Sequence, residues 1–454
     1  MRIPMRFPKI FIKIFVFLLM VAHGFCDWNP ELRRLAEEYM AHHEDKFLSS
    51  LTGSCHYTDS FLKEIPVAIE TWEVPSSMME KGSLPVLVGL QRDEESNIKP
   101  APLIFYVPGS FVNLDDSQPR RWMAEFTTLG YHTVVFPNPW GTQFVEQVPK
   151  GRLGSIQWEA ESLYQVLKDV HTRLLDENVL SGTVRLAGVS SGGFFSSAIS
   201  AMDAESQNPV IDEATLISPP VHFGRTLDRL DELIDQSREP YQDMFRLKLY
   251  WKYRNLCSLG SEDPVSEDDL TDAAGIAVFA GFYEELVNSV KAYDRVKGID
   301  AVPRGFFNWL NPKYRQWRKN FSFENYFKKY NPESKEIVQG KTGHVYYWIS
   351  RAYKAGFSNF RILTTTDDFL NDAALWAGYN ENPLRLEFDS RYGILEGQEE
   401  WEEISDDVLV LQNGGHYGFR GSPWFNNFIR ASFTIDAQER HALKTFNHLY
   451  SDVQ

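Results

Sequence analysis

Cysteine is scarce in this sequence, which contains only Cys26, Cys55 and Cys257. Three cysteines are too few for the disulfide framework that stabilises small secreted domains. None of them stands in the C-x-x-C spacing that is typical of metal and redox sites. Two interpretations stay open for Cys55 and Cys257: one disulfide between them after export, or two unpaired buried thiols.

Positive charge is also in short supply. The chain has 46 Lys and Arg against 62 Asp and Glu, which gives a formal net charge of −16. Domains that bind nucleic acids carry a basic surface, so we expect no nucleic-acid partner. The sequence also lacks internal repeats, low-complexity tracts and a Pro-rich linker. One large domain with an insertion therefore fits the 454 residues as well as two domains do.

A long apolar run is missing at the N-terminus. The run from Ile14 to Ala22 is too short to span a bilayer comfortably, and it follows four basic residues: Arg2, Arg6, Lys9 and Lys13. This pattern predicts a signal peptide over residues 1–24 and export to the periplasm or the extracellular space. Cleavage ahead of Asp27 and an uncleaved membrane anchor are the alternatives. Loss of the four basic residues takes the net charge from −16 to about −20.

A lipid anchor at Cys26 is a weaker alternative. Lipoprotein signals usually have a small residue before the modified cysteine, and this chain has the bulky Phe25 there. The segment that follows, from Asp27 to Lys63, has the composition of a polar helix.

Short apolar runs alternate with helical segments through most of the chain. The first two, Pro66 to Val74 and Leu84 to Leu90, read as an antiparallel pair. The later ones are typical of strands buried on both faces: Leu103 to Val107, His132 to Phe136, Thr183 to Ala187, Ala214 to Ile217, Phe360 to Thr364 and Val408 to Gln412. Between them, Trp158 to Leu175 carries one apolar helical stripe. The pattern predicts an α/β fold with a mostly parallel sheet flanked by helices.

The alternation is interrupted over residues 221–357. A structureless loop of that length is implausible, so we expect a mainly helical cap inserted before the strand that carries the catalytic acid. The core is then residues 25–220 together with 358–454. The cap is rich in aromatic residues between Phe306 and Trp348, which either line a substrate pocket under a lid or form the cap's own small core.

Basic residues interleave with these aromatic ones: Lys313, Arg315, Arg318, Lys319, Lys328 and Lys329. Such a run marks either a membrane-surface contact or an ordinary solvated helix face.

Gly188-Val189-Ser190-Ser191-Gly192 matches G-x-S-x-G between a predicted strand and a predicted helix. A sharp strand-to-helix turn leaves no room for side chains two positions before and after the serine, where this chain has glycine. Ser190 is therefore the predicted nucleophile. With Ser191 in that role, Val189 would occupy a glycine position and clash with the turn.

The strand from Val408 runs into Gly414-Gly415-His416-Tyr417-Gly418-Phe419. A histidine at the carboxyl end of a strand lies at the same end of the sheet as the serine turn, so His416 is the predicted base. The flanking glycines are expected to leave its loop free to fold over the site.

The predicted strand from Phe360 ends in carboxylates. An aspartate at that position would orient the imidazole and stabilise the imidazolium. Asp368, directly before Phe369-Leu370, is the first candidate, and Asp367 and Asp372 are the alternatives.

An oxyanion needs two donors near the serine. We expect the backbone amide of Ser191, at a helix N-terminus, and that of Ser110, in the loop Pro108 to Phe111 after the predicted strand. Many proteins with this motif order have His-Gly where this chain has Pro108-Gly109.

The order of these segments resembles the α/β-hydrolase superfamily, and Gly414 to Phe419 is similar to the histidine segment of its YheT-like branch. The resemblance covers roughly Pro66 to Val221 and Phe360 to Phe433, and leaves the insertion out. It implies an eight-stranded sheet and two-step acyl transfer, but fold analogy does not name a substrate.

The residues together predict a serine hydrolase that cleaves a small or lipid-like carboxylic ester through an acyl-enzyme at Ser190. No metal or organic cofactor is required. Alternatives are a peptidase or amidase, an acyltransferase, and a non-catalytic binding protein of the same fold. The oligomeric state stays open.

Overall fold

A computed structural model of the chain describes residues 30–41, 43–55, 67–238, 252–259, 263–298, 341–371 and 408–433, with residues 312, 313, 316, 322 and 323 as short separate pieces. The predicted signal peptide lies outside the described residues. Among the helices that are described, none is long and apolar enough to cross a membrane.

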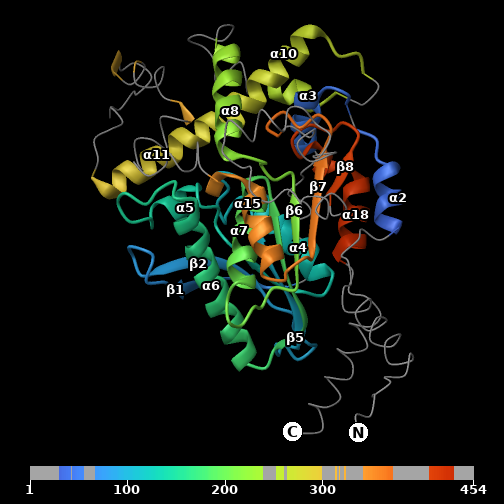
Figure 1. Ribbon diagram of the computed structural model, residues 1–454. Helices are drawn as coiled ribbons and strands as arrows, with labels where there is room; N and C mark the ends of the chain where they lie inside the picture. The colour runs from blue at the N-terminus through green and yellow to red at the C-terminus, as the bar shows by residue number, and fades with distance from the viewer. Residues whose placement is uncertain are drawn as a thin grey trace, which may run out of the picture.

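One eight-stranded sheet forms the centre of the molecule (Figure 1), in the order β1-β2-β4-β3-β5-β6-β7-β8. β2 pairs antiparallel with β1 and β4, and all other neighbours are parallel. The strands are β1 Ile69–Pro75, β2 Ser83–Gly89, β3 Ala101–Val107, β4 His132–Val135, β5 Leu180–Val189, β6 Glu213–Ile217, β7 Phe360–Thr365 and β8 Val408–Leu411. The predicted strands, the antiparallel pair and the mostly parallel sheet are confirmed.

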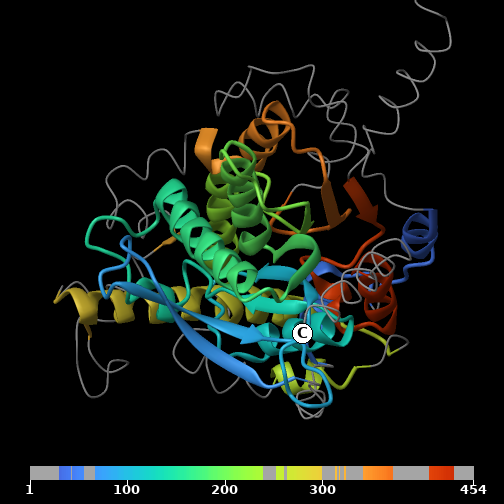
Figure 2. The same ribbon diagram turned by 90° about the horizontal axis from the view of Figure 1, so that it is seen from below.

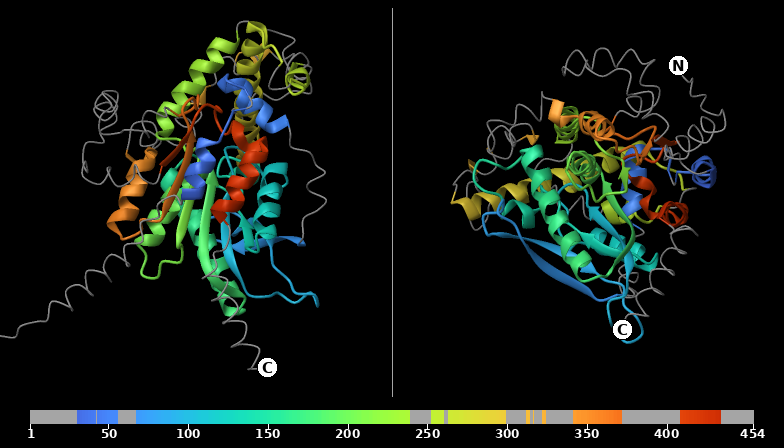
Figure 3. Two further views of the ribbon diagram at one scale, coloured as in Figure 1. Left: turned by 90° about the vertical axis from the view of Figure 1, so that its right-hand side faces the viewer. Right: turned by 60° about the horizontal axis from the view of Figure 1, so that its bottom comes forward.

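Helices cover both faces of the sheet. Figure 3 (left) shows the strands between α15 on one side and α4 and α18 on the other, and Figure 2 shows α6 and α7 side by side. The helices that cover the faces are α4 Ser117–Thr128, α6 Ile156–Asp176, α7 Ser191–Ala204, α15 Val345–Lys354 and α18 Pro423–Phe433, with the short α5 Thr142–Val145 at one edge.

The burial of β3 shows why this strand is apolar throughout. Leu103, Phe105 and Val107 point into the apolar cluster that includes α6, α7 and α15, and Ile104 and Tyr106 point into the cluster under α4 and α18. All seven residues of the strand are buried. Because successive side chains of a strand face opposite ways, a sheet covered on both faces needs apolar residues at every position.

The described part of residues 221–357 is helical. Its elements are α8 Phe223–Arg238, α10 Glu267–Gly275, the π-helix η3 Ile276–Tyr283, α11 Glu284–Lys297, the short η6 Lys341–Gly343, and α15. α8, α10 and α11 lie above one end of the sheet (Figure 1), whereas α15 packs on α7 beside it. The division into core and cap stays a prediction.

In the described part of the chain before the sheet there are two helices, α2 Pro30–Glu37 and α3 Lys46–Cys55, where the sequence indicated one polar helical segment. α2 packs on α18, and α3 packs on the short 3-10 helix η10 Gly418–Gly421 that follows His416. Cys257 is disulfide-bonded, so it is not an unpaired thiol. Its pairing with Cys55 stays a prediction.

Candidate active site

Ser190 lies in a sharp turn between β5 and α7. Its backbone has φ 54° and ψ −127°, a combination rarely adopted by residues other than glycine. A Cβ on Gly192 would lie 2.0 Å from the carbonyl oxygen of Val107, and one on Gly188 would lie 2.2 Å from that of Gly192. Glycine at both positions thus lets three stretches of backbone meet under the serine.

His416 lies between Ser190 and Asp368. Its Nε2 is 2.9 Å from the Oγ of Ser190, and its Nδ1 is 2.9 and 3.0 Å from the two carboxylate oxygens of Asp368. All three side chains are buried, each with less than a tenth of its surface exposed. With Nδ1–H donated to the carboxylate, Nε2 is free to accept the serine proton.

The two neighbouring aspartates differ in their partners. Asp368 also accepts hydrogen bonds from the amides of Leu370 and Asn371 and from the side chain of Asn371, which fix its carboxylate towards the imidazole. Asp367 accepts from the amide of Gly415, and burial raises the pKa of its carboxyl. Asp372, the third candidate, lies outside the described residues.

The histidine loop is held from two sides. The Oγ1 of Thr365 donates to the carbonyl oxygen of Gly415 from the end of β7. On the other side, α3 approaches so closely that a Cβ on Gly415 would lie 2.0 Å from the carbonyl oxygen of Lys46. The sequence analysis expected the glycines to leave this loop free to fold over the site. In the structure, Gly415 is instead needed because α3 packs so closely against it. No local pattern in the sequence indicates this contact between α3 and the histidine loop.

The two predicted oxyanion donors flank Ser190. Ser191 is the first residue of α7, and a Cβ on Gly109, next to Ser110, would lie 3.6 Å from the Cβ of Ser190. Neither the Ser110 amide nor the Ser191 amide donates a hydrogen bond to another residue within the described chain. Their role as donors to an oxyanion stays a prediction.

Asn138, which the sequence analysis did not single out, connects the parts of the site. Its Nδ2 donates to the carbonyl oxygen of Pro108 at 2.8 Å and to the Oγ of Ser191 at 3.0 Å. Its Oδ1 accepts from the amides of Phe111 at 3.3 Å and Trp140 at 2.9 Å. The side chain is fully buried. One amide group thus joins the loop of Ser110 to the serine turn.

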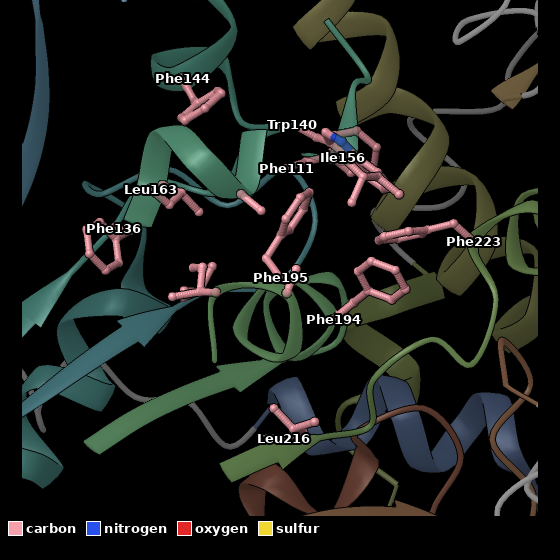
Figure 4. Close-up of a cluster of buried hydrophobic side chains, with 14 of the residues drawn as sticks. Phe111, Phe136, Trp140, Phe144, Ile156, Leu163, Phe194, Phe195, Leu216 and Phe223 are labelled. Atoms are coloured by element: carbon pink, nitrogen blue, oxygen red, sulfur yellow. The ribbon is translucent and has the colours of Figure 1, made fainter. Parts of the chain in front are cut away.

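An aromatic cluster supports this junction (Figure 4). Phe111 and Trp140 lie above α7, and Phe195 projects from α7 towards them. Trp140 Nε1 donates to Glu159, whose pKa burial raises to about 8. Among the described cap aromatics, Phe323 packs against Phe111, with ring centroids 6.3 Å apart. Tyr346 and Trp348 are buried in the main core, so they form neither a pocket lining nor a separate core of the cap.

The described residues contain no group of three or more His, Cys, Asp or Glu side chains that could hold a metal ion. Of the interleaved basic residues in the cap, only Lys313 is described.

No protein-family model matches this sequence, and no curated protein matches it either. Solved structures of similar shape include one from a study of two fungal esterases from Rhizomucor miehei. It is 13% identical in sequence, the match covers 92% of this chain and 96% of the esterase chain, and the TM-score is 0.44. They also include brefeldin A esterase, a bacterial homologue of human hormone-sensitive lipase. It is 15% identical, the match covers 91% of this chain and 94% of the esterase, and the TM-score is 0.39.

A third is the fluorophosphonate-binding serine hydrolase F of Staphylococcus aureus, with 12% identity over 82% of this chain and 100% of that one and a TM-score of 0.39. These values are too low to carry over an activity. The strand order and directions, together with the strand-turn-helix at Ser190, define the α/β-hydrolase fold.

Proposed function

We propose that the protein is an exported serine hydrolase that cleaves a carboxylic ester through a covalent acyl-enzyme. The observation that carries this proposal is the continuous chain of short contacts from Ser190 Oγ through His416 to Asp368, buried at the end of a parallel sheet. This is the arrangement in which a serine hydroxyl becomes a nucleophile. The YheT-like branch remains part of the proposal only as a resemblance of the histidine segment.

The proposed reaction has two steps. Ser190 Oγ bonds to the acyl carbon while its proton passes to His416 Nε2, and the amides of Ser110 and Ser191 stabilise the oxyanion. The bond to the alcohol oxygen then breaks, and that oxygen takes the proton from His416. Water next attacks the acyl-enzyme, gives a proton to His416, and releases the acid as the proton returns to Ser190. Asp368 holds the imidazole in the required tautomer throughout.

Labelling of the purified mature protein by a fluorophosphonate, with identification of the modified peptide, tests the proposal. We expect one modified residue, Ser190. A folded protein that is not labelled and hydrolyses no ester would be a binding protein of this fold. Matched ester and amide substrates, with and without an added alcohol as acyl acceptor, separate esterase from amidase and acyltransferase.

Asn138→Ala is expected to lower kcat by about 10², the loss typical of a misplaced oxyanion donor. The substitution removes all four hydrogen bonds of the Asn138 side chain: two to the Ser110 loop, one to the serine turn and one to Trp140. The rate is to be measured per fluorophosphonate-labelled site, because an effect on folding alone reduces the number of labelled sites and leaves the rate per site unchanged. KM should change less than kcat, since Asn138 is a positioning residue.

Ser191→Ala is the graded comparison for this prediction. It removes the bond from Asn138 to the serine turn but keeps the three that hold the Ser110 loop and Trp140, so we expect a smaller effect, of about 1 kcal/mol. A rate per labelled site that is equal in Asn138→Ala and wild type would contradict the role given to Asn138.

Export is tested by N-terminal sequencing of the mature protein. We expect the chain to begin near Phe25 or Asp27, because basic residues precede a short apolar run that ends in small residues. Intact Met1 on a soluble cytoplasmic protein is the opposite result, and it would remove export from the proposal without touching the reaction.

A further inference from the structure

Three phenylalanine rings from distant parts of the chain gather beside His416. The ring centroid of Phe369 lies 6.0 Å from that of the imidazole, and that of Phe282, in the π-helix η3, lies 6.4 Å from it. Phe47, on α3, lies 4.7 Å from Phe369. We call these three side chains the aromatic wall. One ring comes from α3, one from the π-helix η3 and one from the segment after β7.

The three rings differ in burial. Phe369 is 5% exposed, whereas Phe47 and Phe282 are only partly buried although apolar neighbours surround them. π-helical turns are uncommon and occur frequently at functional sites. Here the π-helix places a partly open ring next to the imidazole that contacts Ser190. The wall thus offers an apolar surface that a ligand at Ser190 can cover.

The two carboxylates that precede Phe369 of the wall, those of Asp367 and Asp368, both accept hydrogen bonds from other groups. The Asp368 carboxylate is bound to His416, and that of Asp367 to the amide of Gly415. The Lys46 ammonium lies 5.3 Å from the ring centroid of Phe47. Phe47 packs on Phe369, and it is Phe369 that packs on the imidazole. The two rings of the wall that lie next to the imidazole are those of Phe282 and Phe369. Because both are apolar, they favour an uncharged ligand group.

The proton path fixes which half of an ester meets this wall. The departing alcohol oxygen takes its proton from His416 Nε2, so the alcohol half must lie on the imidazole side of Ser190. The carbonyl oxygen instead points to the amides of Ser110 and Ser191. Side chains that flank the imidazole therefore face the alcohol half of the substrate.

We infer that the aromatic wall is a binding site for the alcohol half of the ester, and that the preferred substrates are esters of uncharged apolar alcohols. This inference rests on the proposed ester hydrolysis at Ser190. It assigns Phe282 as a residue that determines specificity, with Phe47 extending the surface.

The test is a series of acetate esters of ethanol, butanol, hexanol and octanol, assayed by titration of the released acid. All four give the same acetyl-enzyme, so the alcohol affects only acylation, which kcat/KM reports. We expect kcat/KM to rise about fourfold for each methylene that the wall covers. Phe282→Ala should remove most of this dependence and leave the rate on ethyl acetate within a few-fold of wild type.

Three comparisons make the result specific. Ethyl esters of acids of increasing length should show the same dependence in Phe282→Ala and wild type. Phe282→Leu, which keeps an apolar side chain if the alanine variant folds poorly, should keep most of the alcohol dependence. Phe357→Ala removes an equally half-buried ring before the start of β7, at the opposite end of the strand from the site, and should change neither series.

The inference is overturned if kcat/KM of the wild type does not change with the length of the alcohol. It is also overturned if Phe282→Ala changes the alcohol series and the acid series equally. Fluorophosphonate labelling separates this result from failure of the proposed function. If Ser190 is labelled and esters are cleaved while the alcohol series is flat, only the role of the wall is wrong. If Ser190 is not labelled and no ester is cleaved, both the function and the wall are wrong.

Discussion

Ser190→Ala is expected to abolish fluorophosphonate labelling and to lower ester turnover on the order of 10⁶-fold, the size of loss seen when a catalytic serine is removed. The reason is that Ser190 Oγ is the hydroxyl in contact with His416 Nε2. No acyl intermediate can form without it. Labelling and initial rates on a small activated ester measure the effect.

Ser191→Ala is the natural control, because this serine is adjacent but its hydroxyl accepts a hydrogen bond from Asn138 instead of contacting the imidazole. We expect a loss of less than tenfold, since the backbone amide proposed for the oxyanion is retained. Full activity of Ser190→Ala would falsify the proposed mechanism.

Asp368→Asn is expected to lower kcat by about 10⁴, as removal of the orienting carboxylate does in other serine hydrolases. That factor corresponds to about 5 kcal/mol of transition-state stabilisation. Both carboxylate oxygens lie within 3.0 Å of His416 Nδ1. An amide can present its NH₂ there and favour the wrong tautomer. Initial rates, with thermal unfolding to confirm that the variant is folded, provide the measurement.

Asp367→Asn tests whether the acid has been assigned to the correct residue. Its Oδ1 accepts from the amide of Gly415, and an asparagine oxygen can do the same. The variant should therefore keep most of the activity. If Asp367→Asn is the inactive one and Asp368→Asn is not, the acid is misassigned by one position while the nucleophile and base stand.

The elements that could be predicted are those whose signal is local. Short apolar runs marked β3 to β8, because strands covered on both faces are apolar, whereas alternating stretches marked β1 and β2. Strand ends were less certain: β5 begins at Leu180 rather than Thr183, because Leu180 pairs with Ala101 of a strand far away in sequence. Local patterns do not contain such pairings.

The site shows the same division. The turn at Ser190 was recognisable because its glycines lie within five consecutive residues. Which aspartate faces the imidazole was only ranked, with Asp368 first, because adjacent side chains leave the backbone in different directions and the turn after β7 selects between them. The sequence left three candidates. The structure places Asp368 against His416 and Asp367 against Gly415.

The sequence by itself determined the positions of the strands along the chain and the turn that raises Ser190, since each depends on residues close together in the chain. Only the tertiary structure decided what surrounds them. Asn138 binds Ser191, 53 positions away, and Phe282 from the cap and Phe47 from the N-terminal helix reach the neighbourhood of His416. These contacts depend on packing between distant segments, and no local periodicity or spacing records which segments will meet.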